Sequence, residues 1–490
     1  MSAGLRRSFS SLSVPNYRRY FAGQVVSVSG NWMQMVAEGW LVLSLTSSGV
    51  AVGIATASQF VPLLFFGAVG GLFADRFNKR KLLMCTQAAM AVPALFLLGV
   101  TAAGVVTPLM VYATAFSRGA VNALDNPARQ SFAMEMVGAD RIVNAVSLNS
   151  VIIHTSRIVG PAIAGGVIAI WGVAPCFGVN ALSFVAMLVA LAGMNPRELR
   201  VPKPVAHVPG AIRAGLRYVK GNRELWIPLL LMAIVGTFSF NFQVVLPLIA
   251  RFSFGGNATT YAILLSAMAV GSVTGALVNG ARGQTSPRII GVSAAIFGTF
   301  GLLAALAPSL PVEIILLVPL GMASVTFAAS VNSHLQLAVD PLMRGRVMAL
   351  YSVVFLGSTP IGAPIAGWLS EAIGPRAGLV LAGTAALAAA AVAHFAFRRS
   401  GMGEAAAAEP ALEAPAGELG VRSAGELHRE RARNRVRRGE LGGAREERAG
   451  RRVERRGGQV PAVGEERTIG EQAVEALHKE VVMDLQPAGR

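Results

Sequence analysis

The chain has 490 residues, 53% of them hydrophobic and only 14% charged, whereas soluble domains carry roughly 25% charged residues. Only ten acids precede Phe397, so the composition excludes an ordinary soluble domain. The formal net charge of +17 would suggest a nucleic-acid partner for a soluble protein, but here we expect the cations to face anionic lipid, with no nucleic acid bound. The sequence contains no nucleophile elbow, phosphate loop or metal-ligand spacing, so we expect no enzyme activity, no cofactor and no metal.

Twelve apolar stretches follow one another along the chain, each close to the length of about 20 residues that crosses a bilayer. They lie approximately at residues 21–45, 50–74, 82–104, 107–125, 145–171, 174–194, 225–250, 258–281, 288–307, 311–335, 347–371 and 376–397. The predicted fold is an all-α membrane protein with twelve transmembrane helices in two pseudo-symmetric six-helix bundles.

The connections between these stretches alternate between nearly uncharged and basic. Because Lys and Arg gather in cytoplasmic loops, the alternation predicts a multi-pass protein of the plasma membrane with both termini in the cytoplasm. Apolar residues at 212, 216 and 219 predict a short amphipathic helix on the inner membrane surface. The predicted domains are a cytoplasmic N-terminal segment (1–19), a first bundle (20–194), a central loop (195–224), a second bundle (225–397) and a disordered cytoplasmic tail rich in Arg and Glu (398–490).

The two halves of the chain repeat one another at an offset of about 202–204 residues. Gly160 in the fifth stretch corresponds to Gly362 in the eleventh, and Asp75 corresponds to Asn279. Because the matching stretches come in the same order, with six in each half, the repeat is a parallel one about an axis along the membrane normal.

Polar residues inside the apolar stretches are the main indication of function, because each is costly in lipid and usually faces a partner or water. Asn31, Gln34 and Glu38 recur at helical spacing in the first stretch and form one polar stripe. Glu38 could exchange a proton in a dehydrated cavity, or it could be an inert acid paired with an arginine or an acid in water near the outer rim. Arg118 and Arg157 lie within the fourth and fifth stretches, and each could bind an anionic substrate, pair with Glu38 or form a fixed interhelical pair.

A glycine-rich segment ends in a cluster of charges and reads GLFADRFNKRK over residues 71–81. Gly71 belongs to a helix face that lets a second helix approach closely, and Asp75 lies where the apolar run stops. Arg76 and Arg80 belong to the cations that follow and predict a cytoplasmic turn. Anchoring alone explains the cations but does not require the acid.

A second motif reads RIVGPAIAGG over residues 157–166. Gly160 and Pro161 predict a bend in the fifth helix, where neighbouring helices can satisfy the freed carbonyl group. Gly165 and Gly166 remove side chains from a contact surface, so one helix could roll against another. Tight packing alone is the alternative interpretation, and the two roles are compatible.

With these motifs the chain resembles a major facilitator superfamily transporter over about residues 15–397. Residues 71–81 resemble the superfamily's loop 2–3 motif, and residues 160–166 resemble the antiporter motif of exporters. Similarity to the enterobactin-exporter-like branch, which exports drugs or siderophores, rests on LDNPARQ at 124–130, NAVSLN at 144–149 and DPLMRGRV at 340–347.

The resemblance implies an aqueous cavity between two six-helix bundles and alternating access by rocking. It also implies that Gly71, Asp75, Arg76 and Arg80 form a cytoplasmic latch, and that Arg118 matches an arginine used in proton coupling. The expected function is export of a small amphipathic drug or siderophore-like metabolite by proton-coupled antiport. The expected partners are this substrate, protons and membrane lipids, with the chain acting as a monomer. An uptake symporter or facilitator, and a non-transporting sensor that recruits a partner through its tail, are the alternatives.

Overall fold

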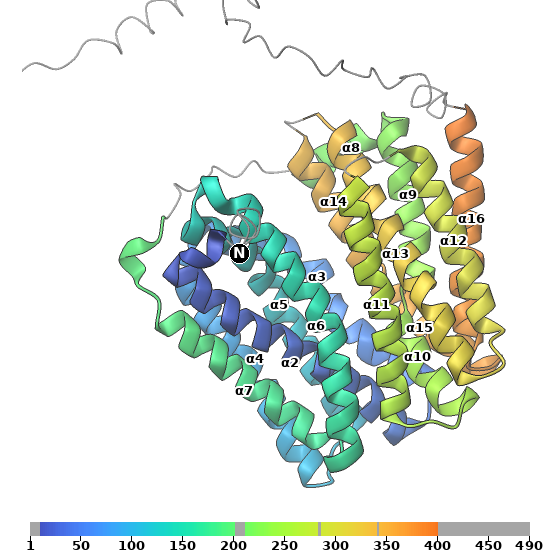
Figure 1. Cartoon of the computed structure of the whole chain (residues 1–490), viewed down its shortest axis with the longest axis horizontal. Coiled ribbons are helices and arrows are strands. Elements are labelled where there is room, and N and C mark those ends of the chain that lie inside the picture. The colour runs from blue at the N-terminus through green and yellow to red at the C-terminus, as the bar shows by residue number, and fades with distance from the viewer. Residues whose placement is uncertain (1–9, 201–210, 283–285, 341–342, 400–490) are drawn as a thin grey trace, which may run out of the picture. The chain divides into compact units, whose positions relative to one another are not determined.

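Long helices make up nearly all of the described chain, and no described residue belongs to a strand. The protein is represented by a computed structural model (Figure 1), which describes residues 10–200, 211–282, 286–340 and 343–399. Side chains are not described at residues 68–75, 139, 143, 211–214, 356, 398 and 399. The surroundings of Gly71 and Asp75, and the predicted tail beyond residue 399, therefore lie outside the described part.

The first half consists of six long helices. They are α2 (Pro15–Thr46), α3 (Gly49–Arg76), α4 (Lys79–Ala102), α5 (Pro108–Val137), α6 (Ile142–Trp171) and α7 (Ala174–Ala192), with short helices η1 (Ser10–Ser13), η2 (Ala139–Arg141) and η3 (Pro196–Glu198). Local sequence sets several boundaries: Asn78 and Thr107 accept backbone hydrogen bonds that begin α4 and α5. Gly172, with φ of 79°, follows the last residue of α6.

The second half also forms six spans, but two of them are interrupted. Its helices are α8 (Ala211–Lys220), α9 (Arg223–Phe238), α10 (Phe242–Leu248), η4 (Ile249–Ser253), α11 (Ala258–Arg282), α12 (Pro287–Ala305), α13 (Leu310–Ala338), α14 (Arg344–Leu356), α15 (Thr359–Ala372) and α16 (Ala377–Arg399). The seventh span breaks near Asn241, whose side-chain amide donates to the Thr237 carbonyl over 2.7 Å. The eleventh span breaks between α14 and α15, where Pro360 stands in the first turn of α15 and has no backbone N–H to continue the ladder.

Ten helical segments of the described chain are long and apolar enough to cross a membrane. The remaining two of the twelve predicted spans are α2 and α5, which have 32 and 30 residues and are therefore long enough but more polar. Glu38 on α2 and Arg118, Asp125 and Arg129 on α5 account for much of this polarity. The prediction of an all-α membrane protein with twelve spans is confirmed, and its two most polar spans, α2 and α5, contain buried charges.

The packing of the two halves follows the predicted repeat. In the first half α3 packs on α5 and α4 on α7, and in the second half α11 packs on α13 and α12 on α16. Figure 1 shows α4 beside α7 and α12 beside α16. The central connection contributes α8, which lies at the position predicted for the amphipathic helix and contacts α14 and α9.

The halves contact each other mainly through two helix pairs, α3 with α15 and α6 with α11. We call the helix ends that carry the Arg- and Lys-rich connections the basic end and the opposite ends the neutral end. Gly49, at the start of α3, meets Gly367 on α15, and a Cβ atom on Gly49 would lie 2.5 Å from the Gly367 carbonyl oxygen. Gly165 on α6 meets Ala262 on α11, with a Cβ–Cβ separation of 2.7 Å if a side chain were present. Both contacts lie toward the neutral end.

Candidate substrate cavity

A cavity of about 1240 Å³ lies beside the polar faces of α2 and α5. Its wall comes mostly from α2, α3, α5 and α6. Smaller parts come from α4, α10, α14, α15 and the residues between α9 and α10. Tyr17 and Ile142, in the first turns of α2 and α6, line it near the basic end, and Trp32 and Phe60 line it farther in. The cavity therefore extends from the basic end toward the middle of the helices.

A buried ion pair joins α2 to α5 at the wall of this cavity. The Arg118 Nη2 atom donates to Glu38 Oε2 over 2.6 Å, and each residue is only 5% exposed. A buried Arg keeps its charge, and removing one partner of such a pair would leave an uncompensated charge. The pairing of Arg118 with Glu38, one of the alternatives that the sequence left open, is the arrangement seen.

A chain of amides supports Glu38 from the side opposite to Arg118. Gln34 Nε2 donates to Glu38 Oε1 over 2.7 Å, and Asn180 Nδ2 on α7 donates to Gln34 Oε1 over 2.5 Å. Ser183 Oγ in turn donates to Asn180 Oδ1 over 2.9 Å. Both carboxylate oxygens of Glu38 thus accept a hydrogen bond, and the network fixes the Glu38 side chain between α5 and α7.

Arg157 takes a different position from Arg118. Its guanidinium carbon lies 5.2 Å from the ring centroid of Trp32, a cation–π distance, and both residues line the cavity. Asn31, from the predicted polar stripe, lines the cavity as well, whereas Gln34 and Glu38 lie behind its surface. The structure therefore brings the predicted polar residues together around one space, in two layers.

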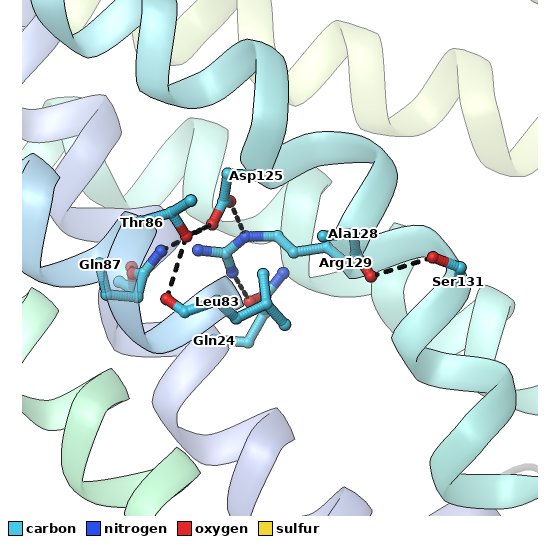
Figure 2. A network of polar contacts seen from close by, with 9 residues as sticks. Gln24, Leu83, Thr86, Gln87, Asp125, Ala128, Arg129 and Ser131 are labelled. Carbon is cyan, nitrogen blue, oxygen red and sulfur yellow. Dashed lines mark hydrogen bonds and ion pairs between the residues drawn. The ribbon is translucent and has the colours of Figure 1, made fainter. Parts of the chain in front are cut away.

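A second charged network occupies the same wall nearer the basic end, and Figure 2 shows its residues. Arg129 donates through Nε to Asp125, one helical turn earlier on α5, and through Nη1 to Gln24 on α2. Asp125 also accepts from Thr86 Oγ1 over 2.6 Å and from Gln87 Nε2 over 2.9 Å, both on α4. Three helices are thus tied together through one carboxylate and one guanidinium.

Asp125 and Arg129 were not predicted as site residues from the sequence. They appear there only within the family motif at residues 124–130. The pair could have been predicted from its spacing. An aspartate and an arginine four residues apart within one span are neighbours on a helix face. Another buried pair close to the basic end, Lys79 with Glu135 at 2.7 Å, links the start of α4 to the end of α5.

The residues of the predicted latch are described only in part. Arg80 donates from Nε to the Leu191 carbonyl over 2.7 Å and from Nη2 to the Ala192 carbonyl over 2.9 Å, at the end of α7. Arg76 is exposed. The side chain of Asp75 and the surroundings of Gly71 fall outside the described residues.

The glycines predicted to let the fifth helix bend or roll, which are Gly160, Gly165 and Gly166, have unequal surroundings. A Cβ atom on Gly160 would lie 2.5 Å from Trp32 Cβ and 2.8 Å from the Ser29 carbonyl oxygen, so this glycine lets α6 approach α2. Gly165 faces α11, whereas Gly166 has no atom within 4 Å of its Cβ position in the described part of the chain. Pro161 lies inside α6, which continues through it to Trp171.

Polar contacts reinforce the glycine contacts at the neutral end. Glu371 Oε2 on α15 accepts from Ser48 Oγ over 2.6 Å and from the Val50 N–H over 3.1 Å. Arg251 Nη1 donates to the Leu43 carbonyl over 2.8 Å. These bonds cross between the halves, and the sequence analysis did not predict them.

Comparison with known proteins agrees with this geometry. The family model described as transmembrane secretion effector matches residues 6–424. The staphyloferrin A transporter of Staphylococcus aureus is 27% identical over 267 residues, which are 53% of this chain and 65% of that protein. The multidrug efflux pump Tap of Mycobacterium tuberculosis is 27% identical over 371 residues, covering 72% of this chain and 86% of that one. Macrolide efflux protein A of Streptococcus pyogenes is 24% identical over 377 residues, covering 74% and 91%.

Solved structures share the fold. The POT family transporter PepTSo superposes with a TM-score of 0.66 at 14% identity, covering 79% of this chain and 99% of that chain. A bacterial homologue of the human lysosomal transporter Spinster, in an inward-facing and unoccupied conformation, superposes with a TM-score of 0.64 at 15% identity, covering 78% and 97%. On this evidence the chain belongs to the transmembrane secretion effector family of the major facilitator superfamily, whose members are membrane transporters rather than enzymes.

Proposed function

We propose that the protein exports a small amphipathic molecule by alternating access. The observation that carries the proposal is a cavity of about 1240 Å³ that reaches the basic end, while direct contacts between the halves close the neutral end. If the basic end is cytoplasmic, as the charge asymmetry predicts, this arrangement is the one that loads substrate from the cytoplasm. The efflux pumps among the relatives support the outward direction.

Glu38 is the residue that we propose to take up a proton in exchange for substrate. It is 5% exposed and bound to Arg118 beside the cavity, so protonation would remove the charge of the carboxylate and weaken a link between α2 and α5. Asn31, Gln34, Arg118 and Arg157 complete the proposed coupling and substrate site. Proton entry would thereby change the contacts of two helices that line the substrate path.

Movement of the halves is proposed to use the glycine contacts and the latch. Gly160, Pro161, Gly165 and Gly166 would let α6 shift against α2 and α11, because the contacts at Gly160 and Gly165 lack side chains that interlock. The residues of the predicted latch are Gly71, Asp75, Arg76 and Arg80. The latch would close the basic end in the state in which the neutral end is open. Asp75 would do so by approaching a helix N-terminus, where a negative charge is favoured.

Accumulation measurements in a bacterial strain without its own efflux pumps test the function. Expression should lower the cell content of ethidium, erythromycin or a carboxylate siderophore, and a protonophore should abolish the difference. Higher accumulation on expression would instead support the uptake alternative, and indifference to the protonophore would remove antiport.

Variants then distinguish the loss of proton coupling from a general loss of folding or transport. Glu38→Gln should lose the response to the proton gradient, whereas Glu198→Gln, at an exposed acid in η3, should behave like the unchanged protein. A chain that ends at residue 399 should retain flux, because a transporter does not need the tail, whereas a sensor that recruits a partner through its tail would lose its function.

A further inference from the structure

The charges around the cavity do not cancel. Arg118, Arg129 and Arg157 line it, and the carboxylates available to them are Asp125 in the lining and Glu38 just behind it. Glu38 pairs with Arg118 and Asp125 pairs with Arg129. Within the described residues, Arg157 has no carboxylate partner, so one positive charge of the cavity is uncompensated.

Arg157 is held in place without being neutralised. The Trp32 ring, 5.2 Å from its guanidinium carbon, supports one face of the group but carries no negative charge. A guanidinium at the wall of a membrane protein is costly unless an anion or water meets it. The half-buried Arg157 side chain therefore offers an unpaired positive charge to the space where substrate would bind.

A second donor without a partner belongs to another residue of the cavity wall, Arg118. Arg118 Nη2 is bound to Glu38, but Arg118 Nη1 is buried and has no hydrogen-bond partner among the described residues. A buried donor without a partner is costly, and a bond to a ligand oxygen would recover that cost. Arg118 can thus donate to a ligand from Nη1 while Nη2 keeps its pair with Glu38.

Aromatic side chains form another part of the wall, beside neutral polar ones such as Asn122, Gln130 and Asn149. Trp32, Phe60, Phe240 and Phe355 line the cavity, and the rings of Phe240 and Phe355 meet edge to face with centroids 5.5 Å apart. Such rings can cover the apolar body of a ligand, while the polar groups of the wall fix its orientation.

We propose that the cavity selects amphipathic organic anions. Arg157 anchors the anionic group, Arg118 Nη1 supplies a second donor, and the aromatic side chains cover the apolar body. This inference rests on the proposed transport function and names the substrate class that it carries. Exchange of one inward proton for one outward anion would move two positive charges inward, so the membrane potential would drive export together with the proton gradient.

Equilibrium binding to the purified full-length protein tests the inference without requiring transport. The probes are dansylglycine, its neutral methyl ester and the cationic amine dansyl-ethylenediamine, which share one fluorescent aromatic body. In nanodiscs of phosphatidylcholine we expect dansylglycine to bind at least tenfold more tightly than the ester, and the amine to bind most weakly. Equal affinities, or tightest binding of the amine, would overturn the inference on the unaltered protein.

Three variants assign the effect to a residue. Arg157→Gln should weaken dansylglycine about tenfold and leave the ester within about twofold, and Arg157→Lys should restore most of the preference. The matched control is Arg288→Gln, which removes the same charge from an exposed position on α12. A parallel loss for all three probes in Arg157→Gln would show that Arg157 only shapes the cavity, and this would contradict the proposal.

Lipid headgroups are the other source of an anion. A competition experiment with phosphatidylglycerol distinguishes them from a small organic anion. If phosphatidylglycerol in the nanodisc displaces dansylglycine, the site belongs to lipid and the small-molecule assignment is overturned. Selective binding without export of dansylglycine would contradict the proposed function and leave the binding inference standing.

Discussion

Glu371, in the last turn of α15, accepts a hydrogen bond of 2.6 Å from the Ser48 hydroxyl group at the start of α3. The same carboxylate oxygen accepts from the Val50 N–H, one of the free donors of the first helical turn. A carboxylate at a helix N-terminus is favoured by the helix dipole as well as by these bonds. Glu371 is thus a charged contact between the halves at the end that is closed in this structure.

Glu371→Ala should favour opening of the neutral end. The lost cap contributes about 1 kcal/mol, which changes the ratio of closed to open molecules about fivefold. Spin labels at Val105 and Leu306, in neutral-end connections of the two halves, would report the change as longer distances in a background without the native cysteines. An unchanged distance distribution would exclude this role for Glu371. Glu198→Ala, at an exposed acid in η3, is the matched control.

The pair of Glu38 and Arg118 should show strong coupling in stability. Glu38→Ala and Arg118→Ala should each destabilise the protein by about 3–5 kcal/mol, because each leaves a buried partner unpaired. The double variant should cost clearly less than the sum of the two single variants. Thermal unfolding in detergent, followed by size-exclusion fluorescence, measures the three differences. Additive costs would show that the pair contributes no interaction of its own.

Asp125→Asn should destabilise the basic half of the first bundle. Asp125 is 2% exposed, and its side chain accepts from Arg129, Thr86 and Gln87. Removal of its charge leaves the Arg129 guanidinium without a counter-ion, and the expected cost is about 3–5 kcal/mol. Asp140→Asn, at an exposed acid in η2, should change stability by less than about 0.5 kcal/mol. Equal unfolding temperatures for the two variants would refute the structural role of the network.

Gly160 and Gly166 should respond oppositely to substitution by alanine. Gly160→Ala would place a methyl group 2.5 Å from Trp32 Cβ and force α6 away from α2, so stability and transport should both fall. Gly166→Ala meets open space and should stabilise the helix by roughly 0.5–1 kcal/mol. Unfolding temperature and efflux rate, measured side by side, check the contrast. Similar losses at both positions would mean that the close contact at Gly160 is not the cause.

Apolar length was enough to predict the twelve spans, because a bilayer requires about 20 apolar residues from each. It placed the end of the fourth span at residue 125, whereas α5 continues to Val137. The helix continues because Asp125 and Arg129 satisfy each other inside the bundle, and periodicity alone does not reveal such pairing. The interruptions in the seventh and eleventh spans were not predicted from the sequence either. A short break in a helix leaves the hydropathy of the span unchanged.

The charged residues of the candidate site could be predicted from the sequence, but the residues with which they pair could not. Glu38, Arg118 and Arg157 are conspicuous because charge is rare inside apolar stretches. Which arginine pairs with Glu38 depends on how α2, α5 and α6 pack, and the sequence left that question open. Glu371 was not predicted as a contact residue, because its partners lie more than three hundred positions earlier in the chain.

Where α3 meets α15, backbone faces backbone through Gly49 and Gly367. At this point of contact neither glycine places a side chain between the two backbones. The two helices can therefore separate there without pulling interlocked side chains apart, which suits a junction that has to part and re-form in the proposed transport cycle.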